Sequence, residues 1–313
     1  MEYRQFGRTG LRVSPIGLGC MTFGREIDEA ASRTIIQRAL EAGINFFDTA
    51  DVYGRGASEE IVGRALHEAR GRVVLATKFY GPMGQGPNDR GGSRYHVMDA
   101  AEASLRRLQT DHIDLYQMHH FDPETPLDET LRALDDLVRA GKVRYIGCSN
   151  FAAWQIAKAF WVSDRDRLAR FVSVQPRYSL VFREPEIDLL PMCASEGLAV
   201  IPYSPLAGGF LTGKYKPGAP PPADTRLATA PWYQDVYIKD KNFRVVEALE
   251  QYAQTRGVPK EQLAIAWVMS QPEVTAPIVG ARTVQQLETA LAACELKMTS
   301  DEHDAMAKLA RQA

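Results

Sequence analysis

The sequence predicts a single (β/α)₈ barrel over residues 1–313, with an N-terminal β-hairpin and two helices outside the repeat. Eight short apolar segments alternate with segments of 3.6-residue periodicity. Repeated strand–helix units imply parallel strands, and eight of them are the number that closes a barrel. A doubly wound sheet is the alternative. The glycines of "GLGCMTFG", which begins at Gly17, are spaced wrongly for the GxGxxG motif typical of many such sheets.

Each element has its own sequence signal. "YRQFGRTGLRVS" predicts the hairpin, with its turn at Arg8–Gly10. The eight predicted strands are "IGLG" from Ile16, "NFFD" from Asn45, "VVLATK" from Val73, "IDLYQMH" from Ile113, "VRYIGCS" from Val143, "FVSVQ" from Phe171, "LAVIPYS" from Leu198 and "APIVG" from Ala276. Among the helices, "EAASRTIIQRALEAG" and "PLDETLRALDDLVRAGK" end at Gly43 and Gly141, as glycine commonly ends helices. "NFRVVEALEQYAQTRG" and "SDEHDAMAKLARQ" predict the two extra helices.

Composition excludes several classes of partner. The net charge is −2 and no basic stripe is present, so we expect no nucleic-acid partner. The N-terminus lacks the apolar segment of a signal peptide, and no apolar run reaches the ~18 residues of a membrane span. The four cysteines lie far apart and the six histidines show no zinc spacing. We therefore expect a cytoplasmic protein without a membrane association or a metal; its oligomeric state is not predicted.

Two predicted connections exceed the usual loop length, 79–94 after the third strand and 207–240 after the seventh. Both leave the C-terminal ends of strands, which form the functional face of such barrels. Substrate lids and disordered surface insertions are both compatible with these sequences. With residues near Phe23, Tyr80 and Trp232, the two loops are expected to build the substrate pocket.

Four polar side chains gather at the predicted strand ends. Asp48 closes the second strand, Lys78 the third and His119 the fourth, while Tyr53 follows the second. Adjacent strand ends share one mouth, so we expect the four to converge. Alternation along the fourth strand predicts that one of two adjacent histidines, His119, faces this site and that His120 faces the outer layer. Each residue alone has a structural explanation, but the combination favours a proton donor.

The expected chemistry follows from the residue types. A tyrosine normally keeps its proton to a pKa near ~10, and the cation of Lys78 is expected to lower that pKa. Asp48 is expected to pair with Lys78 and to offset the cost of its burial. His119 can donate a hydrogen bond to a substrate carbonyl and polarise it.

Six motifs, in order and in register, together resemble the aldo-keto reductase superfamily. They are "GINFFDTADVYG", "VVLATK", "DLYQMHH", "GKVRYIGCSNF", "IPYSPLAGGFLTGKY" and "PIVGARTVQQLE". They are most similar to the branch that contains bacterial reductases and the voltage-gated potassium-channel β subunits. The resemblance extends from Tyr3 to about Ala293. It implies a (β/α)₈ barrel that reduces aldehydes or ketones with NADPH, without metal or flavin.

The resemblance also implies a role for each site residue. Tyr53 would be the general acid, tuned by Lys78 and Asp48, and His119 would orient the carbonyl. The implied cofactor residues are Ser149, Asn150 and Gln175 for the nicotinamide carboxamide, Tyr203 for its ring, Ser204, Pro205, Leu206, Gly208, Leu211, Gly213 and Lys214 for the pyrophosphate, and Gly280, Arg282 and Gln286 around the adenosine 2′-phosphate. One departure affects the adenine contacts: Thr289–Ala290 stands where relatives commonly have Glu-Asn.

Three functions remain in competition. The leading one is a carbonyl reductase. A nicotinamide-binding, redox-sensing regulatory subunit that docks on a partner protein is the second; the complete Tyr–Lys–Asp–His set and the absence of an added N-terminal segment count against it. The third is reduction of an activated C=C bond, for which family members replace the site histidine. The particular aldehyde or ketone, and the use of NADH, are not predicted.

Overall fold

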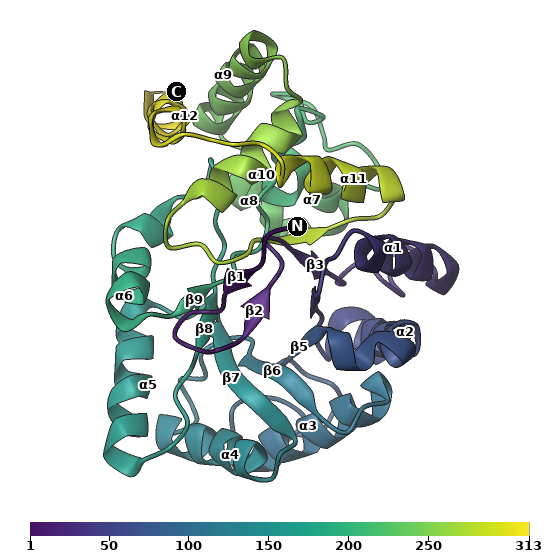
Figure 1. Cartoon of the computed structure of the whole chain (residues 1–313), viewed down its shortest axis with the longest axis vertical. Coiled ribbons are helices and arrows are strands. Elements are labelled where there is room, and N and C mark those ends of the chain that lie inside the picture. Colours follow the sequence, from purple (N-terminus) through teal and green to yellow (C-terminus); the bar gives the residue numbers. More distant parts are fainter. Residues whose placement is uncertain (313) are drawn as a thin grey trace.

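The computed structural model describes residues 1–312 and forms the predicted barrel of parallel strands with surrounding helices (Figure 1). Its eight-stranded sheet has the order β10-β3-β4-β5-β6-β7-β8-β9. The strands are β3 (Gly17–Gly19), β4 (Phe46–Asp48), β5 (Val74–Phe79), β6 (Ile113–Met118), β7 (Val143–Ser149), β8 (Ser173–Gln175), β9 (Ala199–Val200) and β10 (Ile278–Gly280). Each predicted strand segment overlaps one of them, and only β5 extends beyond its segment, by the single residue Phe79, so the strand prediction is confirmed.

The barrel closes between β9 and β10. These strands share no continuous ladder; isolated parallel bridges join Val200 to Val274 and Tyr203 to Ile278. Across this seam the Thr275 amide donates to the Val200 carbonyl at 2.8 Å, and the Ile278 amide donates to the Pro202 carbonyl at 2.8 Å. The seam is therefore held by fewer contacts than the β5–β6 and β6–β7 pairs.

The predicted hairpin closes one end of the barrel. β1 (Arg4–Gln5) pairs antiparallel with β2 (Arg12–Val13). Phe6 of the turn packs edge-to-face on Phe46, with ring centroids 5.8 Å apart. Phe46 begins β4, so the hairpin covers the N-terminal ends of the strands and leaves the C-terminal ends for a site.

Helices follow the strands, as predicted. They are α1 (Glu29–Glu41), α2 (Ala57–Leu66), α3 (Arg94–Leu108), α4 (Leu127–Arg139), α5 (Ala153–Asp166), α6 (Leu189–Glu196), α10 (Lys260–Ser270) and α11 (Val284–Ala293). Gly43 (φ +86°) and Gly141 (φ +74°) follow α1 and α4 in the left-handed conformation that favours glycine. The two extra helices are α9 (Asp240–Arg256) and α12 (Ser300–Gln312), which pack together. Within residues 1–312, no helix is both long and apolar enough to cross a bilayer.

The two long connections differ in structure. Residues 81–92 form turns and bends without a helix or strand. The 207–240 connection contains the 3₁₀ helix η4 (Ala207–Thr212) and two short helices, α7 (Arg226–Thr229) and α8 (Trp232–Tyr237). Tyr233 and Tyr237 of α8 are buried. This second connection is thus packed on the barrel, which favours a lid over a disordered insertion.

Candidate active site

One cavity of about 1120 Å³ opens at the C-terminal ends of the strands. Asp48, Tyr53 and His119 line one part of it. Its lining also includes four cationic side chains, those of Arg177, Lys214, Arg226 and Arg282. Pockets for small ligands usually measure ~300–1,000 Å³, so this cavity has room for a large cofactor beside a small substrate.

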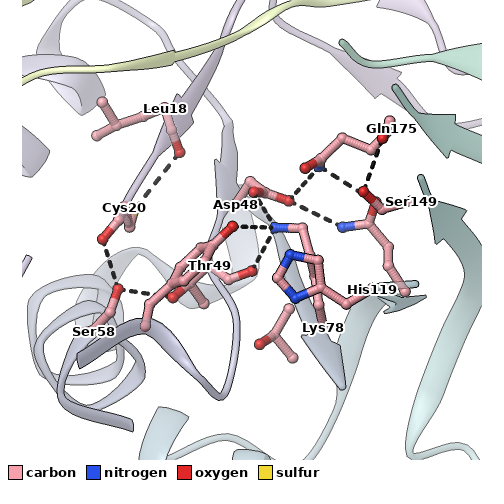
Figure 2. Close-up of polar contacts among 12 residues, drawn as sticks. Leu18, Cys20, Asp48, Thr49, Ser58, Lys78, His119, Ser149 and Gln175 are labelled. Carbon is pink, nitrogen blue, oxygen red and sulfur yellow. Dashed lines mark hydrogen bonds and ion pairs between the residues drawn. The ribbon is translucent and has the colours of Figure 1, made fainter. Parts of the chain in front are cut away.

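Lys78 and Asp48 form a buried ion pair beneath the cavity. Lys78 Nζ donates to Asp48 Oδ1 at 2.5 Å and to the Thr49 carbonyl at 2.9 Å. The lysine side chain is 0% exposed, so each donated bond offsets part of the cost of removing its charge from water. Figure 2 shows Lys78 and Asp48 pointing toward each other between Thr49 and Gln175. The predicted pair is confirmed.

Two glutamines hold the other oxygen of Asp48. Gln175 Nε2 donates to Asp48 Oδ2 at 2.8 Å, and Gln117 Nε2 donates to the same oxygen at 3.0 Å. The sequence patterns do not predict Gln117 as a site residue, although they place it on the same strand face as His119. That shared face is the signal that identifies it.

Tyr53 lies just above the ion pair, at the start of the 3₁₀ helix η1 (Tyr53–Gly56). Lys78 Nζ lies 3.4 Å from its hydroxyl and 5.0 Å from its ring centroid. Burial raises the pKa of Tyr53 above its ordinary value, and the smaller opposing effect of Lys78 does not reverse this. The predicted lowering of the Tyr53 pKa is therefore wrong, because desolvation of the phenolate outweighs the nearby cation.

The two histidines after β6 lie on the same side. His119 packs edge-on against Tyr53, with centroids 5.8 Å apart, and burial lowers the pKa of His119 well below its usual range. The imidazole is thus neutral at neutral pH. His120 also lines the cavity and stacks on His119 at 5.1 Å. Its predicted outer-layer position is wrong, because β6 ends at Met118 and the alternation of a strand ends with it.

A group of amide and hydroxyl side chains lies beside His119. Ser149 Oγ donates to the Gln175 carbonyl at 2.8 Å, and Asn150 Nδ2 donates to the His119 carbonyl at 3.0 Å. The Tyr203 hydroxyl donates to Asn150 Oδ1 at 2.9 Å. All four predicted nicotinamide-site residues therefore line the cavity side by side with His119.

The predicted pyrophosphate loop divides into lining and supporting residues. The members that line the cavity are Ser204, Pro205, Leu206, Gly208 and Lys214. Leu211 is fully buried in the core, and Gly213 lies outside the lining. Burial lowers the pKa of Lys214, and the charges of Arg282 and Arg226 lower it further. Like charges are thus gathered here, as an anion site requires.

Arg282 and Arg226 share one carboxylate at this part of the cavity. Arg226 Nη1 lies 3.0 Å from Glu26 Oε1, and Arg282 Nη1 lies 3.8 Å from Glu26 Oε2. Arg282 also donates to the Asp224 carbonyl at 2.6 Å, and its backbone amide donates to Gln286 Oε1 at 2.8 Å. Gly280, Gln286, Thr289 and Ala290 line the same region. Neither Arg226 nor Glu26 is predicted from the sequence; the position of Arg226 in the long connection is its only signal.

The model of the aldo/keto reductase family matches residues 15–311. The chain belongs to this family. Its relatives include the uncharacterized oxidoreductase YrpG of Bacillus subtilis, 43% identical over 96% of this chain and 93% of the relative. A probable voltage-gated potassium channel subunit beta of Oryza sativa is 40% identical over 92% and 89%. The versiconal hemiacetal acetate reductase of Aspergillus parasiticus is 35% identical over 96% and 95%.

Membership of the aldo/keto reductase family supports an oxidoreductase that acts on small carbonyl compounds with a nicotinamide cofactor. The predicted superfamily and branch are confirmed. Within residues 1–312, no group of three or more His, Cys, Asp or Glu side chains is arranged to hold a metal ion.

The residues that line the cavity agree only in part with those predicted for the substrate pocket. Trp232 lines the cavity, and Tyr80 lies behind His120 with ring centroids 5.6 Å apart. Phe23 itself is fully buried in the core, but its neighbours Met21 and Thr22 line the cavity, so the expected contribution of residues near Phe23 is confirmed. Two further residues, Arg177 and Tyr233, line the cavity without having been predicted.

Proposed function

We propose that this protein is an NADPH-dependent reductase that converts an aldehyde or ketone to an alcohol, with Tyr53 as general acid. One observation carries the proposal: the Tyr53 hydroxyl lies 3.4 Å from the buried Lys78 ammonium and its ring packs against His119 in the same cavity. A proton donor, a cation that stabilises the deprotonated donor and a neutral imidazole are what carbonyl reduction needs around the carbonyl oxygen.

The cavity lining fits the cofactor. Asn150 and Gln175 offer amide groups, and Tyr203 offers a ring beside them. The phosphates would be held by three neighbouring cations, Lys214, Arg226 and Arg282. The carboxylate of Glu26, which contacts the two arginines, neutralises only part of their charge. When bound, the reduced nicotinamide supplies a hydride to the carbonyl carbon.

The protein residues supply the proton and the hydrogen bonds. The raised pKa of Tyr53 keeps its hydroxyl protonated through neutral pH. A neutral His119 donates a hydrogen bond to the carbonyl oxygen and orients it. As the carbon gains hydride and the C=O π bond breaks, Tyr53 transfers its proton to that oxygen. Lys78 stabilises the phenolate until solvent returns the proton.

The test is NADPH consumption by the purified protein with a panel of aldehydes and ketones. We expect sustained turnover, and we expect Tyr53→Phe to lower kcat by ~10²- to 10⁴-fold, the usual size of a general-acid contribution. Fold and NADPH affinity should barely change, because phenylalanine keeps the ring. Near-normal turnover in Tyr53→Phe would assign the proton to another residue. Stoichiometric zinc or flavin in the purified protein would contradict the proposed cofactor.

A redox-sensing regulatory subunit is the second candidate. Two relatives, from Oryza sativa and Arabidopsis thaliana, are named as probable channel β subunits. A regulatory subunit would bind NADPH without sustained turnover across the panel, so the same assay separates the two functions.

A further inference from the structure

Arg177 lies in the cavity at the exit of β8. It follows Gln175, the last residue of β8, by two residues, and both residues line the cavity. Its backbone continues the sheet through a parallel bridge to Tyr203. Arg177 therefore lies one step above the glutamine that holds Asp48, nearer the mouth of the cavity.

Arg177 differs from the other partly buried arginines of residues 1–312. Arg38, Arg64, Arg70, Arg107, Arg170, Arg183, Arg226 and Arg282 each lie within 4 Å of a carboxylate. Arg4 instead donates to three backbone carbonyls. Among the described residues, no carboxylate or carbonyl partner is assigned to Arg177, and its Nε is buried without an acceptor.

Five aromatic rings surround the guanidinium. The rings of Phe182, Tyr203, Trp232, Tyr233 and Tyr237 have centroids 4.9–5.9 Å from Arg177 Cζ. Cation–π contacts stabilise the charge of the guanidinium without neutralising it. The Tyr203 hydroxyl is a hydrogen-bond partner of the guanidinium. The Tyr237 hydroxyl is a second buried polar atom nearby without a partner.

The surroundings connect Arg177 with the catalytic residues. Tyr233 contacts the guanidinium and also lies close enough to Tyr53 to influence its hydroxyl. The phosphates of a nicotinamide cofactor have their own cations in Lys214, Arg226 and Arg282, whereas Arg177 stands between the Tyr203 ring and α8. An unneutralised guanidinium among aromatic rings matches a ligand that has an anionic group on an apolar frame.

We propose that Arg177 recognises a carboxylate on the substrate, so that the preferred substrates are aldehydes or ketones that carry a carboxylate on an aromatic or other apolar frame. This inference rests on the proposed carbonyl reduction. Arg177 selects the substrate and takes no part in hydride or proton transfer.

The experiment compares 4-formylbenzoate with its neutral methyl ester, which keeps the aldehyde and the ring. We expect the wild type to prefer the carboxylate by at least ~10-fold in kcat/KM, as charge-assisted hydrogen bonds imply. Arg177→Gln should lower kcat/KM for the carboxylate by ~10- to 100-fold, mainly through KM, with a far smaller change for the ester. Arg177→Lys should recover part of the lost kcat/KM, because lysine keeps the positive charge but cannot form the paired hydrogen bonds that a guanidinium makes to a carboxylate.

Arg170→Gln is the matched control. Arg170 also lies over an aromatic ring, that of Phe160 at 4.0 Å, but outside the cavity lining, so its replacement should leave both substrates unaffected. Calorimetric titration with benzoate gives a readout without turnover: wild type should bind it and Arg177→Gln should bind it at least ~10-fold more weakly.

Three results would overturn the inference. Equal losses for carboxylate and ester would mean that Arg177 only anchors α8. A weaker NADPH Kd with unchanged substrate preference would assign Arg177 to the cofactor. No preference for the carboxylate in the wild type, with good turnover of the ester, would leave the proposed reductase standing and remove this inference alone.

Discussion

The proposed catalytic residues and the cations proposed to bind the phosphates differ in how they are held. Lys78 and Asp48 are 0% and 3% exposed, and each lies on a strand of the barrel. Arg282 is 32% exposed, lies beyond β10, and is tied to the 207–240 connection through the Asp224 carbonyl. The proposed catalytic ion pair thus lies on strands, whereas the cations proposed to bind the phosphates lie in the connections that follow the strands.

This difference has a physical reason. Proton transfer depends on positions defined to a fraction of an ångström, and two strands of the barrel hold the Lys78–Asp48 pair beneath the Tyr53 hydroxyl. Binding a charged phosphate tolerates small displacements, because Coulomb attraction changes slowly with distance. The two regions should therefore respond differently to substitution.

The largest expected effect is on the strand side. Lys78→Met leaves the Asp48 carboxylate buried without its cation, so we expect a loss of ~3–5 kcal/mol in the free energy of unfolding. Activity should also fall, because the phenolate loses its stabilising charge. Urea denaturation measures the first effect.

The double variant Asp48→Asn/Lys78→Met is the control for this prediction. It removes both charges, so it should be more stable than Lys78→Met alone. If Lys78→Met is as stable as the wild type, the charges of Lys78 and Asp48 do not contribute to stability. The contrast between the strand-held pair and the loop-held cations would then disappear.

An intermediate effect is expected at Arg282. Arg282→Ala should weaken NADPH binding by ~10- to 150-fold, because a charge-assisted hydrogen bond to the 2′-phosphate is worth ~1.5–3 kcal/mol. NADH lacks that phosphate, so its affinity should change little. Titration of wild type and variant with both cofactors decides the matter. Because Arg282 also holds the Asp224 carbonyl, equal losses for the two cofactors would indicate a loop-supporting role instead.

The smallest effect is expected at Glu26. Glu26→Gln removes the carboxylate beside Arg226 and Arg282, so the positive potential rises and NADPH should bind ~2- to 5-fold more tightly at low salt, the range of a partly exposed ion pair. The gain should vanish at high salt. Glu288→Gln, which removes the partner of Arg38 outside the cavity lining, should not change affinity. Weaker binding in Glu26→Gln would mean that Glu26 positions the two arginines.

Much of the strand side could be predicted from the sequence. The strand segments are short apolar runs, and Asp48, Lys78 and His119 follow from where those runs end. Parallel strands carry their C-terminal ends to one mouth, so convergence needs no knowledge of loops. The same reasoning missed Gln117, although its place on the inner face of β6 was evident.

The loop side could be predicted only in part. Glu26 and Arg226 meet because two connections approach each other, and no periodicity encodes that approach. His120 was misplaced because alternation holds only within a strand and β6 ends at Met118. The predicted direction of the Tyr53 pKa shift was wrong because burial raises this pKa while the charge of Lys78 lowers it. Which effect is larger can be judged only from the three-dimensional structure. Arg177 was missed because an arginine after a strand has no distinctive pattern.

The sparse seam between β9 and β10 has a consequence for the motions of the barrel. Local opening of a fold begins where few hydrogen bonds must break together, so the amides of Thr275 and Ile278, which bridge this seam, are expected to exchange with solvent before those of β6. Tyr203 follows β9 and Arg282 follows β10, so a ligand that contacts both spans the seam. Occupancy of the cavity and integrity of the barrel are therefore thermodynamically linked, because a ligand that contacts both sides stabilises the closed seam between β9 and β10.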